Sequence, residues 1–221
     1  MEVKLTQITP NIIQFLADCG STCYDSDPKS PLGLVKHVYR SGHHSVLEHA
    51  YFTFEISGIS RALSHQLVRH RHSSFSQRSQ RYCSEDGFGY VNPPNVDLDN
   101  IMDYLEACYT TLQEAGVPNE DARYVLPNAC ETQLVMSCNL SQLIHIANVR
   151  LCNRAQWEIR SLVRKMCDLV IEKEPALKMM LVPECEALAP YCFCKEAKSC
   201  GRHKTLSEIF EMAHNYENLC K

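Results

Sequence analysis

Apolar residues recur at helical spacing along most of the chain. The clearest case is residues 155–172, where one stripe consists of Ile159, Leu162, Val163, Met166, Leu169 and Val170. The same pattern, with its capping and terminating residues, predicts further helices at 9–20, 30–42, 59–70, 97–116, 141–151 and 207–219, and a short helical turn at 118–127. The expected N-caps are Thr9, Asp97 or Asp99, and Ser141, and the expected stops are Gly20, Gly42 and Gly116.

Alternating apolar and polar residues predict only two strands. These are residues 50–58, which are rich in aromatic and β-branched side chains, and residues 132–140. Few strands, many helices and no strand–helix–strand rhythm indicate an α+β fold. Without an internal repeat or a Pro/Gly/Ser-rich linker, a single domain spanning residues 1–221 is expected, with a Cys-rich C-terminal extension at about 183–221.

Composition narrows the functional class. The 221 residues are 45% hydrophobic, and the net charge of −4 argues against a general nucleic-acid binder. We expect a cytoplasmic protein, because no signal peptide and no membrane-spanning segment is visible. The thirteen cysteines are expected to be reduced structural thiols.

Several familiar catalytic motifs are missing. The chain contains no G-x-G-x-x-G, no phosphate-binding Walker loop and no G-x-S-x-G elbow. The stretch "HHSVLEH" at 43–49 does not have the spacing of a zinc protease motif, so a turn with satisfied polar side chains is favoured over a metal site.

Residues 69–82, "RHRHSSFSQRSQRY", concentrate positive charge in an otherwise acidic chain. The segment follows the predicted helix at 59–70 and is expected to continue as a loop. Arginine forks bind phosphate through paired hydrogen bonds, and the intervening serines and glutamines can add neutral donors. From the residues alone, a site for a nucleotide-type anion and a hydrated surface cluster remain equal alternatives. On the helix at 155–172, Gln156 and Arg160 are i,i+4 neighbours beside the apolar stripe.

Four motifs in order resemble those of the flavin-dependent thymidylate synthases. "RHRHSSFSQRS" contains the R-H-R-x7-S signature, and "GHHSVLEHAYFTFEI" is similar to the family's G-H-x-[ST]-x-x-E-H turn and strand. "ARYVLP" and "ANVRLCNRAQWEIR" resemble two further family segments, so the resemblance extends from about residue 42 to residue 160. It implies the fold of that family, with an antiparallel sheet packed with several long helices.

The resemblance also implies an activity. This is reductive methylation of dUMP to dTMP, with FAD as cofactor, NADPH as reductant and methylenetetrahydrofolate as carbon donor. It further implies a homotetramer with active sites formed between subunits, and neither a nucleic-acid polymer nor a membrane as partner.

Residue roles follow from the same resemblance. The residues implied to face FAD are Ser45, Arg69, His70, Arg71, Gln77, Asn148, Arg150 and Arg154. Those implied to hold dUMP are Gln66, Arg69, Gln77, Arg78, Ser79, Gln80, Arg81, Arg123 and Arg160. Arg160 would act catalytically at the uracil ring, because a cation beside the developing charge lowers the barrier to attack from C5. Ser79 is assigned to binding, since no general base lies beside it in the sequence.

Three positions depart from the common family pattern. Gln77 stands where glutamate is frequent, Cys23 where serine is frequent, and Arg154 where histidine or asparagine is usual. No flavin contact is therefore carried onto Cys23.

Two rival interpretations come from other classes. The first is an RNA- or nucleotide-binding module that stacks bases on Phe75, Tyr82 and Tyr90. The second is a redox or zinc protein built on the tail, whose candidate ligands are Cys185, Cys192, Cys194, Cys200 and His203. Their spacing is not that of a paired zinc knuckle, so free thiols are favoured there and the metal remains unknown.

Overall fold

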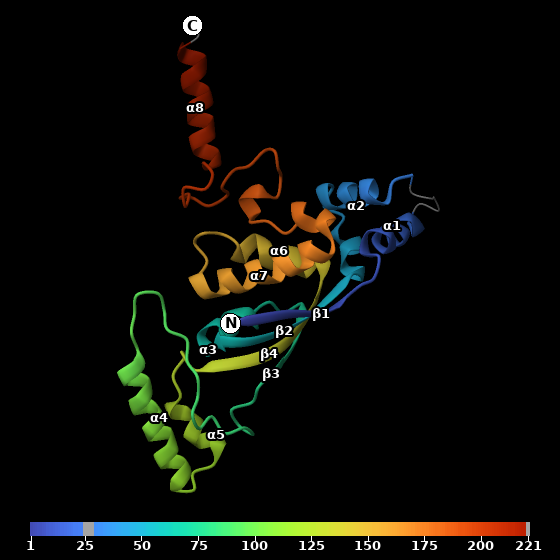
Figure 1. Cartoon of the computed structure of the whole chain (residues 1–221). Coiled ribbons are helices and arrows are strands. Elements are labelled where there is room, and N and C mark those ends of the chain that lie inside the picture. Colours follow the sequence, from blue (N-terminus) through green and yellow to red (C-terminus); the bar gives the residue numbers. More distant parts are fainter. Residues whose placement is uncertain (24–28, 220–221) are drawn as a thin grey trace. The chain divides into compact units, whose positions relative to one another are not determined.

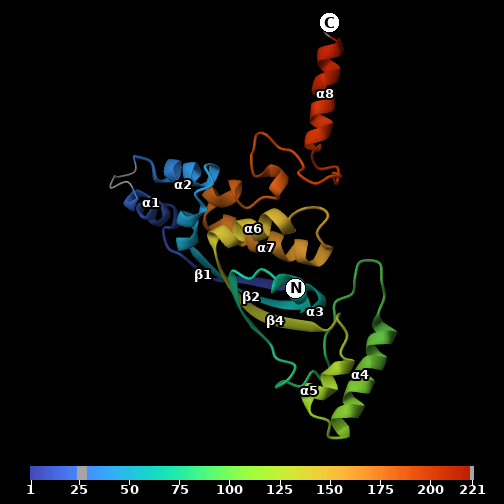
Figure 2. The same cartoon turned by 180° about the vertical axis from the view of Figure 1, so that it is seen from behind.

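The computed structural model describes residues 1–23 and 29–219, with side chains described as far as residue 214. The chain divides into two compact units. One, here called the sheet unit, comprises Met1–Gln7 and Phe52–Cys138, and the other, the helix unit, comprises Ile8–Tyr51 and Asn139–Lys221. Figures 1 and 2 show the elements of each unit from opposite sides.

The sheet unit is built on an antiparallel sheet with the strand order β1-β2-β4-β3. Its elements are β1 (Glu2–Ile8), β2 (Tyr51–Ser60), α3 (Arg61–Leu67), β3 (Ser73–Gln77), α4 (Asp99–Glu114), α5 (Asn119–Ala122), the 3-10 helix η2 (Arg123–Val125) and β4 (Glu131–Asn139). In the pairing of β3 with β4, Ser73 lies opposite Cys138 and Gln77 opposite Leu134. The expected α+β class and antiparallel sheet are therefore confirmed.

The two central strands follow the alternation that predicted them. Along Tyr51–Ile56 and along β4 every second residue is buried, and these residues are Phe52, Phe54 and Ile56 on β2 with Thr132, Leu134, Met136 and Cys138 on β4. At the end of β2, Ile59 and Ser60 are both buried. Because one face of each strand is apolar and the other polar, burial of the apolar face fixes which side chains point toward the core. The strands predicted at 50–58 and 132–140 are confirmed.

The two edge strands were not predicted. β1 was missed altogether, and the segment that forms β3 was expected to be a loop. No residue of β1 or β3 is fully buried. β1 has only a short alternation, in which Val3 and Leu5 lie between polar residues, and β3 consists of polar residues apart from Phe75. Short polar strands are common at sheet edges, where backbone pairing with a neighbour supplies the stabilisation.

The helix unit contains two packed helix pairs, α1 with α2 and α6 with α7. Its elements are α1 (Ile12–Thr22), α2 (Pro31–Arg40), the 3-10 helix η1 (His44–His49), α6 (Leu140–Arg150), α7 (Trp157–Lys173), the 3-10 helices η3 (Pro175–Met179) and η4 (Glu184–Glu186), and α8 (Leu206–Leu219). The stripe predicted on α7 is buried except for Leu169, which is half-buried.

Several helix starts differ from the prediction. α1 begins after Asn11, which is left-handed, because Thr9 instead accepts a hydrogen bond from the Tyr51 N–H on its hydroxyl at 2.9 Å. α6 is capped by the Asn139 side chain, not by Ser141. α4 begins after Leu98 without a side-chain cap, although the carboxylate of Asp97 accepts the N–H of Asp99.

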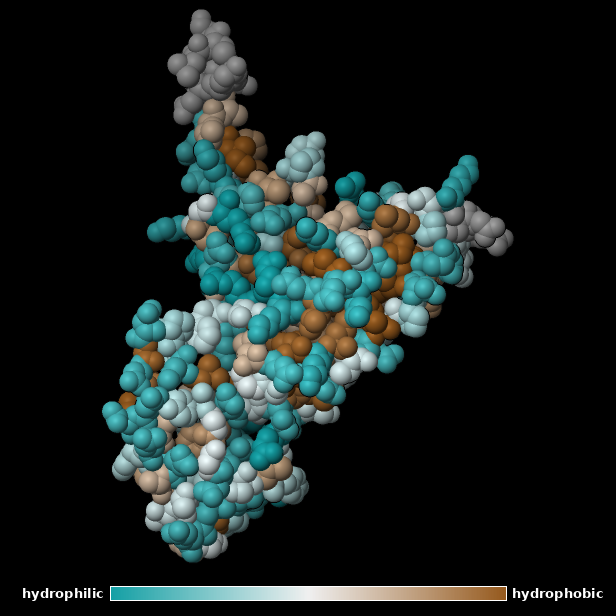
Figure 3. Space-filling view, viewed as in Figure 1, coloured by the Kyte–Doolittle hydropathy of each residue, from teal (hydrophilic) through white to brown (hydrophobic). Residues whose placement is uncertain are grey.

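Helix α8 carries apolar side chains at its surface (Figure 3). Its exposed apolar residues are Leu206, Ile209, Phe210 and Met212. In the described part of the chain, no helix is both long enough and apolar enough to cross a membrane.

Candidate functional site

The predicted site residues are divided between the two units. The sheet unit contains Gln66, Arg69, His70, Arg71, Gln77, Arg78, Ser79, Gln80, Arg81 and Arg123. The helix unit contains Ser45, Asn148, Arg150, Arg154 and Arg160. Each set is described within its own unit.

The R-H-R motif lies in the turn between α3 and β3. His70 is buried, at 7% exposure, whereas Arg69 and Arg71 on either side are exposed. Among the described residues neither arginine takes part in an ion pair. The motif thus anchors itself through the histidine and presents two guanidinium groups outward.

The next two arginines of the basic segment are paired with acids of the same unit. Arg78 donates from Nε to the buried carboxylate of Glu85 at 3.1 Å, and this hydrogen bond with its charge raises the pKa of Arg78. Arg81 donates from Nε to Glu120 at 2.6 Å and lies over the ring of Tyr82. Part of the positive charge in this segment is therefore already offset by the protein.

The amide and hydroxyl side chains next to these arginines, at positions 77, 79 and 80, form hydrogen bonds with neighbouring residues. Gln77 donates from Nε2 to the hydroxyl oxygens of Ser64 at 3.0 Å and Thr132 at 3.3 Å. Gln80 is buried and donates to the Cys130 sulfur at 3.7 Å. The Ser79 hydroxyl accepts the N–H of Arg81. These contacts orient the segment from within the sheet unit.

A cavity of about 300 Å³ in the sheet unit gathers basic groups without an acid. Its lining residues are Arg61, His65, Gln80, Arg123, Tyr124, Leu126, Pro127 and Asn128. Arg123 also donates to the backbone carbonyl of Glu120 at 3.0 Å, which orients its side chain. A concave site with two guanidinium groups and no carboxylate in its lining suits an anion such as a phosphate.

Sequence reasoning found only part of this cavity. It had selected Gln80 and Arg123, but it missed Arg61 and His65 of α3. Both lie four residues apart, so they share one face of the helix. That i,i+4 spacing is the signal in the sequence that indicates this pair.

In the helix unit, the candidate side chains donate to backbone carbonyls. Asn148 donates to the carbonyl of Val182 at 2.7 Å, and Arg154 to that of Lys198 at 3.2 Å. Arg154 also pairs with Glu196 at 3.5 Å. Of the other two predicted residues here, Ser45 is exposed in η1 and Arg150 is half-buried at the end of α6.

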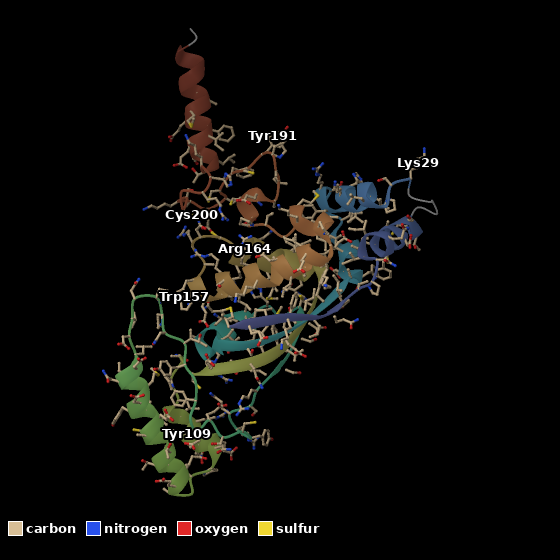
Figure 4. The ribbon with its side chains drawn as sticks, viewed as in Figure 1. Lys29, Tyr109, Trp157, Arg164, Tyr191 and Cys200 are labelled. Atoms are coloured by element: carbon tan, nitrogen blue, oxygen red, sulfur yellow. The ribbon has the colours of Figure 1, made fainter. Side chains whose placement is uncertain are left out.

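Arg160 projects from the first turns of α7 and donates to the carbonyl of Asn153 at 2.6 Å. A second basic cavity, of about 480 Å³, is lined by Leu151, Asn153, Trp157, Arg160, Ser161, Arg164 and Arg202. Figure 4 shows Trp157 and Arg164 on α7. Because a carbonyl carries no net charge, Arg160 is oriented without being neutralised. Sequence reasoning missed Arg164 and Arg202.

Comparisons with known proteins identify the family of this chain. A family model described as thymidylate synthase complementing protein matches residues 4–176. The flavin-dependent thymidylate synthase of Geobacter sulfurreducens is 39% identical over 231 residues, covering 95% of this chain and 98% of the relative. That of Clostridium tetani is 35% identical over 250 residues, covering 95% and 97%.

A solved structure is similar as well. The crystal structure of thymidylate synthase X from Helicobacter pylori with FAD and dUMP has a TM-score of 0.71 and 26% sequence identity. It covers 82% of this chain and 99% of its own. The fold is thus that of a thymidylate synthase. The chain belongs to the flavin-dependent thymidylate synthase family.

Proposed function

We propose that this chain binds FAD and dUMP and catalyses the reductive methylation of dUMP to dTMP. NADPH would supply the reducing equivalents and methylenetetrahydrofolate the carbon. Family membership and the H. pylori structure with FAD and dUMP support the proposal. Within this chain, the observation that carries it is the acid-free cavity of the sheet unit, lined by Arg61, His65 and Arg123.

The phosphate of dUMP fits this cavity. Two guanidinium groups can each offer paired donors to phosphate oxygens, and the buried Gln80 adds a neutral amide. Arg78 and Arg81 contribute less free charge, because each is already bonded to a carboxylate. Their proposed role at dUMP is therefore one of shape and orientation more than of charge.

Arg160 is proposed to act at the uracil ring. C5 of uracil becomes nucleophilic when negative charge can develop at N3 and the ring carbonyls, and a guanidinium beside those atoms stabilises that charge. The carbonyl of Asn153 holds one guanidinium nitrogen, which leaves the remaining donors for a substrate. Among the described residues Arg160 takes part in no ion pair, so the geometry presents an oriented cation that keeps its charge.

The residues present also fit a flavin cofactor. Arg69 and Arg71 offer exposed guanidinium groups to an anionic diphosphate, while the buried His70 fixes the turn between them. Asn148 and Arg150, and Ser45 from η1, are proposed to contact the same cofactor. When bound, FAD supplies the hydride chemistry, and the protein supplies orientation and charge.

We further propose a homotetramer in which subunits share active sites, with both units of each chain forming one catalytic domain. Residues at about 183–221 remain a proposed Cys-rich extension: they lie beyond the end of the family model at residue 176, although the G. sulfurreducens relative aligns with 95% of the chain. Light scattering of the purified protein would then give a mass near four times the 25.2 kDa of one chain.

The direct test is to purify the chain, identify any chromophore released on denaturation, and reduce the protein anaerobically with NADPH. We expect FAD in near one-to-one amount and dTMP formed only when dUMP and methylenetetrahydrofolate are both added. A protein that stays colourless after incubation with FAD would overturn the proposal. Strongly salt-dependent RNA affinity in that case would favour the RNA-binding alternative.

A further inference from the structure

The C-terminal part of the helix unit draws three short segments together through its backbone. The Phe193 N–H donates to the carbonyl of Cys185 at 3.1 Å, and the Cys194 N–H donates to the carbonyl of Lys204 at 2.8 Å. These bonds set Cys185 and Cys194 beside the segment that carries His203. The chain here has little regular structure, so these few contacts define the arrangement.

The side chains of these segments meet at one cavity of about 270 Å³. Among its lining residues are Cys152, Cys185, Cys194, Cys200 and His203. Figure 4 labels Cys200 in the tail. Cys152 comes from the loop after α6, so the cavity joins the tail to the loop that also carries Arg154. All of the cysteines described by the structure are free thiols.

Two potential metal ligands are already close. The Cys185 sulfur, a His203 ring nitrogen and a Glu186 carboxylate oxygen all lie within 4.8 Å of one another. In a tetrahedral zinc site with bonds of about 2.0–2.3 Å, two ligand atoms are roughly 3.4–3.8 Å apart. A modest closure would therefore bring Cys185 and His203 onto one ion.

The surroundings of His203 resemble those of a metal-bound histidine. Its Nε2 lies 3.4 Å from the Glu186 carboxylate, and such a carboxylate commonly orients a ligating imidazole and leaves the other ring nitrogen for the metal. The Ser199 hydroxyl donates to the His203 carbonyl and accepts the Gly201 N–H, which closes the turn before the histidine. Arg202 donates to the carbonyl of Leu151 and so fixes the same turn to the loop after α6.

We propose that this cavity is a structural zinc site in which Cys185 and His203, whose ligand atoms already lie close together, bind the ion and Glu186 orients His203. The remaining two ligands would come from the thiols of Cys152, Cys194 and Cys200, which line the same cavity. Three thiolates and one imidazole are a donor set that zinc favours in closed structural sites. The ion would clamp the tail onto the loop that carries Asn153 and Arg154.

The test measures metal and does not depend on turnover. The full chain is stripped with a strong chelator, reloaded with Zn²⁺, desalted and analysed for zinc by mass spectrometry. We expect about one zinc per chain in the wild type, and zinc affinity at least tenfold weaker in Cys185→Ser and in His203→Ala. Cys192→Ser is the matched control, since Cys192 belongs to the same tail but not to the cavity lining, and it should keep its zinc.

Two further measurements separate loss of a ligand from loss of fold. Co²⁺ added to stripped wild type should produce thiolate-to-cobalt charge-transfer absorption, and His203→Cys, which replaces one zinc ligand by another, should retain zinc. The proposal is overturned if reloaded wild type holds no zinc and shows no such absorption. It is equally overturned if Cys185→Ser binds zinc as tightly as the wild type.

Discussion

Arg78 and Arg81 of the sheet unit are held in a different way from Arg160 of the helix unit. In the sheet unit, Arg78 and Arg81 are bonded to the carboxylates of Glu85 and Glu120. In the helix unit, Arg160 donates to a backbone carbonyl, and Arg154 has a carbonyl as well as an exposed acid as partners. A carboxylate orients an arginine and offsets its charge, whereas a carbonyl orients it and leaves the charge in place.

This difference separates arginines that build the fold from arginines that are available to a ligand. By this criterion Arg160 is available, and so are Arg61 and Arg123, whose shared cavity has no carboxylate in its lining. Arg78 belongs to the first kind, although the family resemblance placed it at dUMP. Four substitutions test the distinction, in order of expected effect.

The largest effect is expected from Arg160→Ala. Removing one donor that stabilises developing charge commonly lowers the rate by about 10²–10³. We expect dUMP-dependent turnover to fall by that factor while FAD content stays at the wild-type level. Lys173→Ala, which removes an exposed cation from the last turn of the same helix, is the control and should turn over normally. Normal turnover in Arg160→Ala would show that an uncancelled charge is not what matters at this position.

Arg123→Ala should weaken dUMP binding more than it affects stability. Hydrogen bonds to charged groups are worth about 1.5–3 kcal/mol, which corresponds to roughly 10- to 100-fold in the dissociation constant. Calorimetric titration with dUMP measures this loss. Arg61→Ala should behave alike, because both side chains line the acid-free cavity. Lys4→Ala, which removes an exposed cation of β1, is the control. If Lys4→Ala weakened dUMP binding equally, the cavity would have no specific role in binding.

Arg78→Ala should act mainly on the free energy of unfolding. It leaves the Glu85 carboxylate, which is 8% exposed, without its ion-pair partner. Since Arg78 itself is partly exposed and solvent screens the pair, we expect a loss of about 1–2 kcal/mol, measured by urea unfolding. When Glu85→Gln is already present, Arg78→Ala should lower the free energy of unfolding by less. A dUMP affinity that falls as far as in Arg123→Ala would instead place Arg78 among the ligand-binding arginines.

Much of the fold was predictable, because a helix or strand that buries one face carries apolar residues at the period of that element. β2 and β4 were found from alternation, and α7 from its stripe, since each must hide one apolar face. The pattern is short in β1 and absent from β3, which lie at the edges of the sheet and bury no residue fully. Their place is fixed by backbone pairing with a neighbour, which the side chains do not reveal.

The predictions of the helix caps and of the cavity residues were wrong or incomplete for a related reason. Thr9 has the right chemistry for a cap, but a long-range bond to Tyr51 uses its hydroxyl. The basic motif can be read directly from the sequence. The pairing of Arg78 with Glu85 and the inclusion of Arg61 in a cavity depend instead on how the chain folds. Residue types predicted the chemistry of the site, and tertiary contacts decided which arginines remain available.

The smallest effect is expected from Arg154→Ala. Its ion pair with Glu196 joins two side chains that are each more than half exposed, at 54% and 61%, so the unfolding free energy should change by less than about 0.5 kcal/mol. The hydrogen bond to the Lys198 carbonyl ties Arg154 to the tail, so the variant should free that segment locally. Hydrogen exchange at residues 195–199 would detect this change.

FAD retention in the same variant then decides what Arg154 does. We expect Arg154→Ala to keep more FAD than Arg69→Ala, because Arg69 forms no ion pair among the described residues and Arg154 is already engaged by the tail. If Arg154→Ala loses FAD as completely as Arg69→Ala, its guanidinium must leave Glu196 for the cofactor. Arg154 would then be a ligand-binding group that the tail engages only until the cofactor binds. The arginines would then differ in when they become available to a ligand more than in whether their charge is offset.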